Sequence, residues 1–445
     1  MQRRDLFKLV GLSIIASASL LSPISLEASS VSSTSGKDVV IVGGGFGGLS
    51  VAKALKKADK SINVTVLEKR EIFMSCPYSN TYLGGMQGVT FEQLTHDYYA
   101  PAAKYGYNFV QCEVIGIDRE AKVVKTTTGD FGYNVLVLAP GIAYDYTKQF
   151  PSWDAQKISL VSRECPSALM PGSEHLALKR QLDNMNDGNI VIVPPQKGKF
   201  RCPPAPFERT SMLASYMKQK KIKGKVIVLD TSDGTFAKNK AFMETWSDLY
   251  PNIVEYHGKA PIVDVDVKNK TITYKENEVD VTIKYEVCNL MPYNKVSPVI
   301  GMAGLQTTKN GFVAMNSTGF QSKTDPNVYV VGDCVGHGVP ASGQTAIWSG
   351  KRASLQIVAQ LNNSTFDVKS GLPAQAANVC YSMVNTNPAE AIMVQHEFVA
   401  DADTGNINAV PNVPKPADGS GKFRSKGTGK LTTEWYNGVK RELFS

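Results

Sequence analysis

The chain has 445 residues, of which 42% are hydrophobic and 20% are charged, and its formal net charge is +8. At about 150 residues per domain, this length predicts about three domains. The composition is typical of a globular protein with large buried cores, and it excludes disorder, collagen and coiled coil as the main structure. Lysine and arginine form no dense block, so we do not expect nucleic-acid binding, whereas an acidic protein partner stays open.

Residues 1–30 have the pattern of an export signal. Arg3 and Arg4 precede an apolar run from Leu9 to Leu21, and small residues follow near Ala28. The arginine pair resembles a twin-arginine signal, which exports proteins already folded around a cofactor to the periplasm. An ordinary secretion signal and a short membrane anchor are the alternatives. No later stretch has about 18 uninterrupted apolar residues, so we expect no integral membrane span in the mature protein.

A glycine-rich turn between a strand and a helix is the first motif of the chain. The β-branched run 38–42 predicts a buried strand, and the glycine-rich segment 43–48 follows it directly. A helical pattern and a second strand, 64–67, come next, and that strand ends at Glu68. This strand-turn-helix-strand order is the context in which a glycine fingerprint indicates a dinucleotide site.

Each fingerprint residue has a physical role in such a site. Gly43 permits the tight turn, Gly45 lets the backbone approach a pyrophosphate, and Gly48 lets the helix pack closely on the strand. The helix N-terminus offers free N–H groups to the phosphates, and Glu68 would accept hydrogen bonds from ribose hydroxyls. A glycine-rich turn without a ligand is the alternative.

Two further strands end in turns of the same general kind. The strand at 133–138 leads to Gly141, and the strand at 328–331 leads to Gly332-Asp333. Together with the fingerprint they resemble the flavoproteins that have two dinucleotide-binding domains. That resemblance implies bound FAD, with Asp333 on its ribityl chain and a helix at about 342–361 whose first residues, Ser342 and Gly343, face the flavin. The positive end of that helix would stabilise reduced flavin.

The region 171–296 repeats the α/β pattern without the glycines. Strands are expected at 189–193 and 225–229, with a helix at about 206–220 between them. Where nicotinamide-dependent relatives carry a second fingerprint, this chain has Pro194-Pro195 and further prolines. Proline removes the N–H donors that a pyrophosphate needs, so we expect no NAD(P)H binding there.

The predicted fold class is α/β, with two Rossmann-like domains and a small C-terminal α+β interface domain. Residues 36–170 and 297–365 form the predicted FAD-binding domain, 171–296 the second domain, and 366–445 the C-terminal domain, in which 390–399 has an antiparallel-strand pattern.

Six segments carry a more specific resemblance, to the flavoprotein subunit of flavocytochrome c sulfide dehydrogenase, a relative of sulfide:quinone oxidoreductase. They are Ser75-Cys76-Pro77-Tyr78-Ser79-Asn80, Phe200-Arg201-Cys202-Pro203-Pro204, Phe207-Glu208-Arg209, Gly332-Asp333-Cys334, Val379-Cys380-Tyr381-Ser382 and Glu434-Trp435-Tyr436-Asn437.

This resemblance implies a set of roles. Cys76 would bond covalently to FAD, Cys202 and Cys334 would form a redox-active disulfide, and Glu208 would be the acid beside them. The activity would be oxidation of sulfide to sulfur or polysulfide, with electrons passed to a c-type cytochrome subunit. Haem would belong to that partner, because this chain has no Cys-x-x-Cys-His segment. The alternatives are a structural bridge or buried thiols for the two cysteines, and a first-turn helix charge for Glu208.

The sequence gives no functional role to the remaining cysteines and to the histidines. Cys112, Cys165 and Cys288 are expected to be structural, and the sequence assigns no role to Cys380. The five histidines are scattered, so no metal site is expected.

Two rival functions remain from the sequence. A quinone-reducing sulfide oxidoreductase should carry amphipathic C-terminal helices for the membrane, and the polar, glycine-rich segment 419–427 argues against that. A non-catalytic flavin-bearing subunit of a sulfur-oxidation complex is the other rival, and the presence of both Cys202 and Cys334 favours catalysis over it.

Overall fold

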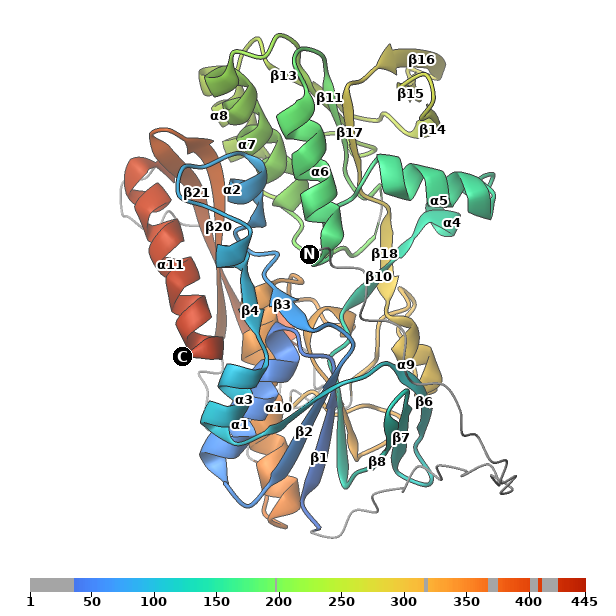
Figure 1. The fold of residues 1–445 in the computed structure, drawn as a ribbon, viewed down its shortest axis with the longest axis vertical. Helices are drawn as coiled ribbons and strands as arrows, with labels where there is room; N and C mark the ends of the chain where they lie inside the picture. Colours follow the sequence, from blue (N-terminus) through green and yellow to red (C-terminus); the bar gives the residue numbers. More distant parts are fainter. Residues whose placement is uncertain (1–35, 197, 316–318, 367–374, 401–406, 410–422) are drawn as a thin grey trace, which may run out of the picture.

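The computed structural model describes residues 36–196, 198–315, 319–366, 375–400, 407–409 and 423–445. Figure 1 shows two α/β units, one above the other, and a C-terminal unit along one side of both. The predicted export signal, residues 1–30, lies outside the described residues, as do residues 419–422 of the segment 419–427.

The first unit is a five-stranded parallel sheet in the order β19-β9-β1-β2-β5. Every residue of β1 is buried, as its run of valine and isoleucine predicts. The helices α1 and α10 lie together against this sheet (Figure 1), and a Cβ on Gly350 would stand 2.6 Å from the carbonyl oxygen of Gly47. The strands and helices are β1 (Asp38–Val42), α1 (Phe46–Ala58), β2 (Asn63–Glu68), α3 (Tyr99–Tyr105), β5 (Asn108–Gln111), β9 (Val135–Leu138), α9 (Pro298–Met302), β19 (Val328–Val330) and α10 (Gly343–Leu361).

The second unit repeats this plan with one strand fewer. Its parallel sheet has the order β13-β12-β11-β17, and each unit also carries a three-stranded antiparallel meander. The elements are α5 (Ala155–Glu164), α6 (Ser173–Asn184), β11 (Ile190–Val193), α7 (Ala205–Lys220), β12 (Val226–Leu229), α8 (Asn239–Leu249), β13 (Val254–His257) and β17 (Val287–Leu290). The meanders are β6 (Val114–Asp118), β7 (Val123–Thr126) and β8 (Gly129–Gly132) in the first unit, and β14 (Ile262–Asp266), β15 (Thr271–Glu276) and β16 (Val279–Lys284) in the second.

The chain crosses between the units twice, through β10 (Ile142–Asp145) on the way out and β18 (Tyr293–Val296) on the way back. These two strands pair antiparallel and form the bridge at the middle of Figure 1. The second unit is thus inserted into the first, whose last strand, β19, follows it in the chain. Short elements complete this part of the fold: β3 (Ile72–Met74), α2 (Ser79–Leu83), η1 (Glu92–Leu94), β4 (Thr95–Asp97), α4 (Tyr146–Gln149) and η2 (Gly332–Cys334).

The C-terminal unit combines a sheet with one long helix. Strands β20 (Gln375–Thr386) and β21 (Ala389–Ala400) pair antiparallel, and β22 (Ile407–Ala409) and β23 (Arg424–Ser425) pair with β21. The helix α11 (Lys426–Phe444) packs on this sheet, and the sequence pattern did not predict it. Ser425 caps its first turn by accepting a hydrogen bond from the backbone N–H of Thr428 at 3.0 Å.

The structure confirms the predicted α/β class with two Rossmann-like units and an α+β C-terminal part. Among the described residues, no helix is long and apolar enough to span a bilayer.

Close packing of α1 on β1 depends on Gly48. A Cβ there would stand 1.9 Å from the carbonyl oxygen of Gly43, a distance that backbone atoms cannot accommodate without moving. We therefore expect Gly48→Ala to lower the free energy of unfolding in urea by about 1–3 kcal/mol. Gly45→Ala is the control, because a Cβ on Gly45 meets no atom within 4 Å and its φ is −77°. Equal stability of the two variants would contradict this account of the packing.

Candidate functional site

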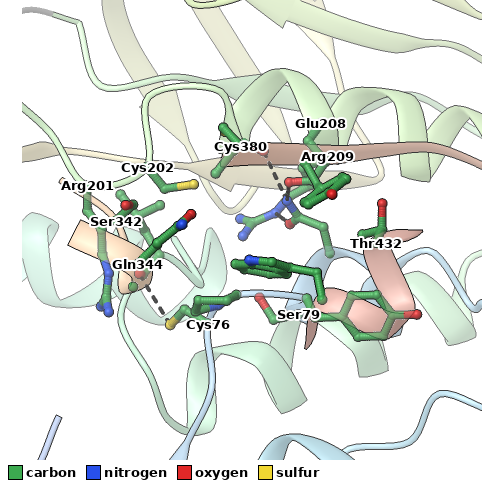
Figure 2. A pocket seen from close by; sticks show the side chains of 18 of the residues that line it. Cys76, Ser79, Arg201, Cys202, Glu208, Arg209, Ser342, Gln344, Cys380 and Thr432 are labelled. Carbon is green, nitrogen blue, oxygen red and sulfur yellow. Dashed lines mark hydrogen bonds between the residues drawn. The ribbon is translucent and has the colours of Figure 1, made fainter. Parts of the chain in front are cut away.

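A pocket of about 820 Å³ lies where the two units and the C-terminal unit meet. Figure 2 shows side chains from all three parts pointing into it. The residues that line it come from six segments: Cys76, Pro77, Tyr78, Ser79 and Asn80; Ala168 and Leu169; Arg201, Cys202, Ala205, Glu208 and Arg209; Ser342, Gly343 and Gln344; Val379, Cys380 and Tyr381; Thr432 and Trp435.

Cys76 reaches this pocket from the turn before α2. The carbonyl oxygen of Cys76 accepts a hydrogen bond from the N–H of Ser79 at 2.9 Å, and Tyr78 is in the left-handed region with a φ of 72°. The Sγ of Cys76 lies 3.6 Å from the carbonyl oxygen of Leu169. Burial raises the pKa of the Cys76 thiol, and the positive charges of Arg201, Arg70 and Arg209 oppose that rise.

Cys202 is held in an uncommon backbone conformation at the start of α7. Its φ is 49°, which few residues with a side chain adopt. Its N–H donates to the carbonyl oxygen of Ala341 at 2.8 Å, and its own carbonyl oxygen accepts from Ala205 at 2.8 Å. These two bonds fix the loop that carries the thiol.

Cys380, on β20, is the cysteine that meets Cys202. Both line the pocket (Figure 2), and after burial the neighbouring Cys380 is the next largest cause that raises the pKa of the Cys202 thiol. Lys238 lies beside them, since its Nζ donates to the carbonyl oxygen of Cys380 at 2.8 Å. A positive charge at this place favours a thiolate.

Cys334 is not where the predicted disulfide needs it. It lies in the turn η2, is 0% exposed, and its Sγ points to the carbonyl oxygen of Val331 at 3.4 Å. It does not line the pocket that holds Cys202, and burial and the adjacent Asp333 raise the pKa of its thiol. The structure therefore does not bring Cys334 to Cys202 as the prediction required, and the cysteines that line the pocket with Cys202 are Cys380 and Cys76. All seven cysteines are thiols in this structure.

Glu208 is buried in the same pocket as the two cysteines. One carboxylate oxygen accepts from Asn80 Nδ2 at 3.0 Å and the other from the N–H of Met383 at 2.9 Å. Burial raises the pKa of this carboxyl, while these two hydrogen bonds and the charge of Lys238 hold it down. A carboxylate so placed can take a proton from a small substrate near the cysteines.

Arg209, next along α7, supplies the positive charge under the pocket. It is 1% exposed and donates to Asn80 Oδ1 at 2.9 Å and to Asn289 Oδ1 at 2.9 Å. It also donates to the carbonyl oxygens of Ser167 at 2.7 Å and Ala168 at 2.6 Å. Burial lowers its pKa to about 10, so the guanidinium stays charged at neutral pH. Asn80 thus bridges a buried acid and a buried base.

The glycine turn forms a cradle at the other end of the first unit. Gly43 has a φ of 105°, and a Cβ there would stand 2.4 Å from the carbonyl oxygen of Ala139, whereas the space above Gly45 is open. Glu68, at the end of β2, accepts from the N–H of Gly44 at 2.8 Å. A second hollow, of about 880 Å³, lies beside this turn and is lined by Gly43, Glu68, Arg70 and Pro140 among others.

The remaining predicted cofactor residues lie in the turn after β9, in η2 and at the start of α10. Gly141 follows β9 with a φ of 72°, and Ser342 caps α10 by accepting from the N–H of Thr345 at 3.1 Å. Ser342 and Gly343 line the pocket itself. Asp333, expected on a ribityl chain, forms an ion pair with Arg201 at 3.2 Å between Oδ2 and Nε.

Two family models match the chain. One, described as the central part of the sulfide dehydrogenase (flavocytochrome c) flavoprotein chain, covers residues 175–292, and one described as pyridine nucleotide-disulphide oxidoreductase covers residues 37–169. The flavoprotein chain of flavocytochrome c sulfide dehydrogenase from Chlorobaculum thiosulfatiphilum is 59% identical over 44 residues, which are 92% of that sequence and 10% of this chain. The chain belongs to this family. It is a flavoprotein oxidoreductase of the sulfide dehydrogenase type.

More distant likenesses agree with the fold. The type II NADH:quinone oxidoreductase of Staphylococcus aureus is 31% identical over 107 residues, 24% of this chain and 26% of that one. The solved sulfide:quinone oxidoreductase of Aquifex aeolicus has a TM-score of 0.66 and 18% identity, and the match covers 92% of both chains. A NAD-dependent persulfide reductase of A. fulgidus has a TM-score of 0.59 and 16% identity, over 84% of this chain and 73% of that one. These two structures share the fold.

The residues of this flavoprotein fit FAD. The cradle leaves open space above Gly45, where a Cβ would otherwise point, and it offers the free N–H groups of a helix N-terminus. Glu68 lies at one end of this path, and Cys76 and the capped N-terminus of α10 lie at the other. An extended dinucleotide needs this sequence of groups.

Sequence reasoning missed three members of the site. Cys380 and Asn80 stand inside segments that carried the family resemblance, and Arg209 follows the predicted Glu208 directly. Their roles depend on contacts between segments far apart in the chain, such as the bond from Arg209 to Asn289. No spacing pattern in the sequence encodes such contacts.

Mild oxidation of the purified protein should join Cys202 to Cys380. Diamide treatment, alkylation and peptide mass spectrometry should find this cross-linked peptide pair, because the two thiols share one pocket. Cys334→Ser should leave the cross-link unchanged, whereas Cys380→Ser should abolish it. A Cys202–Cys334 peptide as the main product would overturn this expectation.

Proposed function

We propose that this flavoprotein oxidises sulfide with bound FAD as electron acceptor and passes the electrons to a c-type cytochrome subunit. The observation that carries the proposal is the meeting of Cys202, Cys380 and Glu208 in the pocket that also holds Cys76. The name of the Chlorobaculum relative includes sulfide and flavocytochrome c, which supports this substrate and this kind of acceptor.

The first step uses a disulfide between Cys202 and Cys380. Glu208 takes the proton of hydrogen sulfide, and HS⁻ bonds to one cysteine sulfur while the bond between the two cysteines breaks. The products are a persulfide on one cysteine and a thiolate on the other. Lys238 and Arg201 place positive charge near Cys202, which stabilises a thiolate there against burial.

The second step releases the product. A second HS⁻ attacks the outer sulfur of the persulfide, so that HSS⁻ leaves and the cysteine becomes a thiol. The thiol and the thiolate then return to the disulfide with loss of two electrons and one proton. The sum is two HS⁻ converted to HSS⁻, a proton and two electrons. FAD, when bound, supplies the two-electron acceptor that this chain's own residues lack.

Cys76 is proposed to hold FAD covalently through the flavin 8α carbon. Its Sγ lies in the same pocket as Ser342 and Gly343, which supports a position beside one edge of the ring. A thioether at that edge raises the potential of a flavin, and this suits transfer to a cytochrome better than transfer to nicotinamide.

The acceptor and location are part of the proposal. The twin-arginine pattern of residues 1–30 favours the periplasm, and the absence of a Cys-x-x-Cys-His segment leaves haem c to a partner subunit. The quinone rival would need exposed apolar surface on the C-terminal helix. On α11, Leu431 is the one exposed large apolar side chain, whereas Tyr436 and Leu443 are buried, and so small an apolar surface favours the cytochrome as acceptor.

Sulfide should bleach the flavin absorbance of the holoprotein in stopped-flow measurements. Cys202→Ser and Cys380→Ser remove the electrophilic sulfur pair, so each should slow this bleaching by orders of magnitude, while dithionite still reduces the flavin. Cys334→Ser is the matched control and should keep a near wild-type rate, because that thiol faces Val331 and not the pocket. Fast bleaching in the Cys202 and Cys380 variants would refute the mechanism.

The pH profile of this reduction should depend on Asn80. The base works when Glu208 is ionised, that is, above its pKa, and the hydrogen bond from Asn80 holds that pKa down. Asn80→Leu should therefore move the acid limb of the rate profile to higher pH, and Glu208→Gln should remove the limb and lower the rate by about 10²–10⁴-fold. Asn108→Leu, at an exposed site where the side-chain amide donates to Asn63 Oδ1 at 3.3 Å, is the control and should leave the profile unchanged. If the acid limb of the rate profile stays at the same pH in Asn80→Leu, the result argues against Glu208 as the base.

Acid denaturation should separate the covalent from the free cofactor. After precipitation of the wild-type holoprotein, the yellow colour should remain with the chain, whereas Cys76→Ser should release FAD into the supernatant. Cys165→Ser serves as the control, because Cys165 lines neither this pocket nor the hollow beside the glycine turn. Free FAD from the wild-type protein would contradict the covalent bond.

A further inference from the structure

A third hollow, of about 1100 Å³, lies behind the loop that carries Cys202. We call it the proline pocket. One layer of backbone separates it from the pocket that holds Cys202, and the N–H of Cys202 closes that layer by donating to the carbonyl oxygen of Ala341 at 2.8 Å. Phe200 and Pro203 face the proline pocket, whereas Arg201 and Cys202 line the other one. Its remaining lining includes Pro194, Pro195, Gln196, Lys199, Phe207, Asp230, Phe236, His337 and Pro340.

Two buried donors in this lining have no acceptor. His337 Nδ1 accepts from the N–H of Val339 at 3.1 Å, and burial lowers the pKa of the ring to about 3. The ring is therefore neutral with its proton on Nε2, and that N–H has no partner in the part of the chain that the structure describes. Gln196 Nε2 is also buried and unpaired there. Unpaired buried donors are costly and indicate a missing acceptor.

Lys199 adds positive charge on the same side. Its Nζ donates to the carbonyl oxygens of Val335 at 2.6 Å and of His337 at 3.3 Å. Both acceptors are neutral, and burial lowers the pKa of the ammonium while the charge of Asp333 raises it. A lysine ammonium has three donors, so one remains for a ligand.

The carboxylate in the lining is already satisfied. Asp230 accepts from the hydroxyl of Tyr256 at 2.8 Å, from the N–H of Ser232 at 3.1 Å and from the hydroxyl of Ser232. It therefore offers little to a ribose, and Pro194 and Pro195 offer no N–H to a pyrophosphate. The buried unpaired side-chain atoms of this lining among the described residues are two donors, and Lys199 adds a cation, which fits an anion and does not fit a pyridine nucleotide.

The remaining lining suits a polarisable ligand. Phe207 and Phe236 stack with ring centroids 3.8 Å apart, and prolines complete the apolar surface. Sulfur is large, soft and weakly hydrated compared with oxygen, and it packs well against aromatic rings.

We propose that the proline pocket binds a sulfur anion, with its charge on Lys199, His337 Nε2 and Gln196 Nε2 and its sulfur against the phenylalanines. This proposal rests on the proposed function, because the reaction in the pocket that holds Cys202 forms such anions on the other side of one layer of backbone. A polysulfide from that reaction and a sulfur oxyanion from solution share this chemistry.

Isothermal titration of the holoprotein with thiosulfate tests the site without turnover. Thiosulfate should bind once per chain and at least about tenfold more tightly than sulfate, which differs by one oxygen in place of the outer sulfur. Gln196→Leu removes an unpaired amide at little cost to the fold, and Lys199→Met removes the cation. Each should weaken thiosulfate binding by about tenfold or more. Lys220→Met, an exposed change of the same charge at the end of α7, should have no effect.

The same titration with tetrasulfide identifies the source. The holoprotein carrying Cys202→Ser and Cys380→Ser cannot react with it through the disulfide, and tighter binding of tetrasulfide than of thiosulfate would indicate the enzyme's own product. Tighter thiosulfate binding would indicate a sulfur oxyanion from solution, and either result supports the site.

Four results would overturn the proposal: no thiosulfate binding, equal binding of sulfate, binding that neither Gln196→Leu nor Lys199→Met weakens, or competition by NADH or AMP at the same site. Flavin bleaching by sulfide is measured separately, so failure of the reaction and failure of this site give different patterns. Loss of bleaching with retained thiosulfate binding would refute only the reaction.

Discussion

The buried guanidinium of Arg209 is the contact on which the site depends. Its acceptors come from α2 of the first unit, from the segment at 167–168, and from β17 of the second unit. Removing a charge from water costs several kcal/mol, and only well-placed hydrogen bonds offset that cost. The four acceptors are neutral groups, and the guanidinium must bond to them to offset the cost of its burial. Its hydrogen bonds therefore fix the positions of these groups relative to one another. These bonds thereby keep the turn that carries Cys76 at a fixed distance from the helix that carries Glu208.

Local patterns were enough to predict most of the fold. The run of valine and isoleucine at β1, the glycine turn and the acid at the end of β2 are close in sequence and determine one another through backbone sterics and burial. The same reasoning located β11, α7 and β12. It failed at α11, because Gly427 and Gly429 lie in its first turn and weaken any helical pattern. Gly429 is required there, since a Cβ would stand 2.3 Å from the carbonyl oxygen of Ala389. Tertiary packing outweighs propensity at this place.

The sequence predicted which segments form the site, but it did not predict which side chains contact one another there. The motif residues Cys76, Cys202 and Glu208 do meet in one pocket, although they come from distant parts of the chain. The error at Cys334 came from reading adjacency to Asp333 as adjacency in space. In the tight turn η2, neighbouring side chains point in different directions, so the carboxylate reaches Arg201 while the thiol faces Val331. Cys380, which lines the pocket with Cys202, comes from β20, a strand that pairs with nothing in either α/β unit.

The insertion of the second unit between β9 and β19 also sets the order in which the molecule can form. The pairing of β19 with β9 closes a loop that contains the whole second unit, and long loops of this kind slow folding. Until that pairing occurs, β9 is an unprotected apolar edge that can pair with other chains. The turn η2 and the helix α10 follow β19, so the cofactor cradle stays open at one side throughout synthesis. The cofactor can therefore be fully enclosed only after β19, η2 and α10 have been made, which sets flavin loading late in the formation of the molecule.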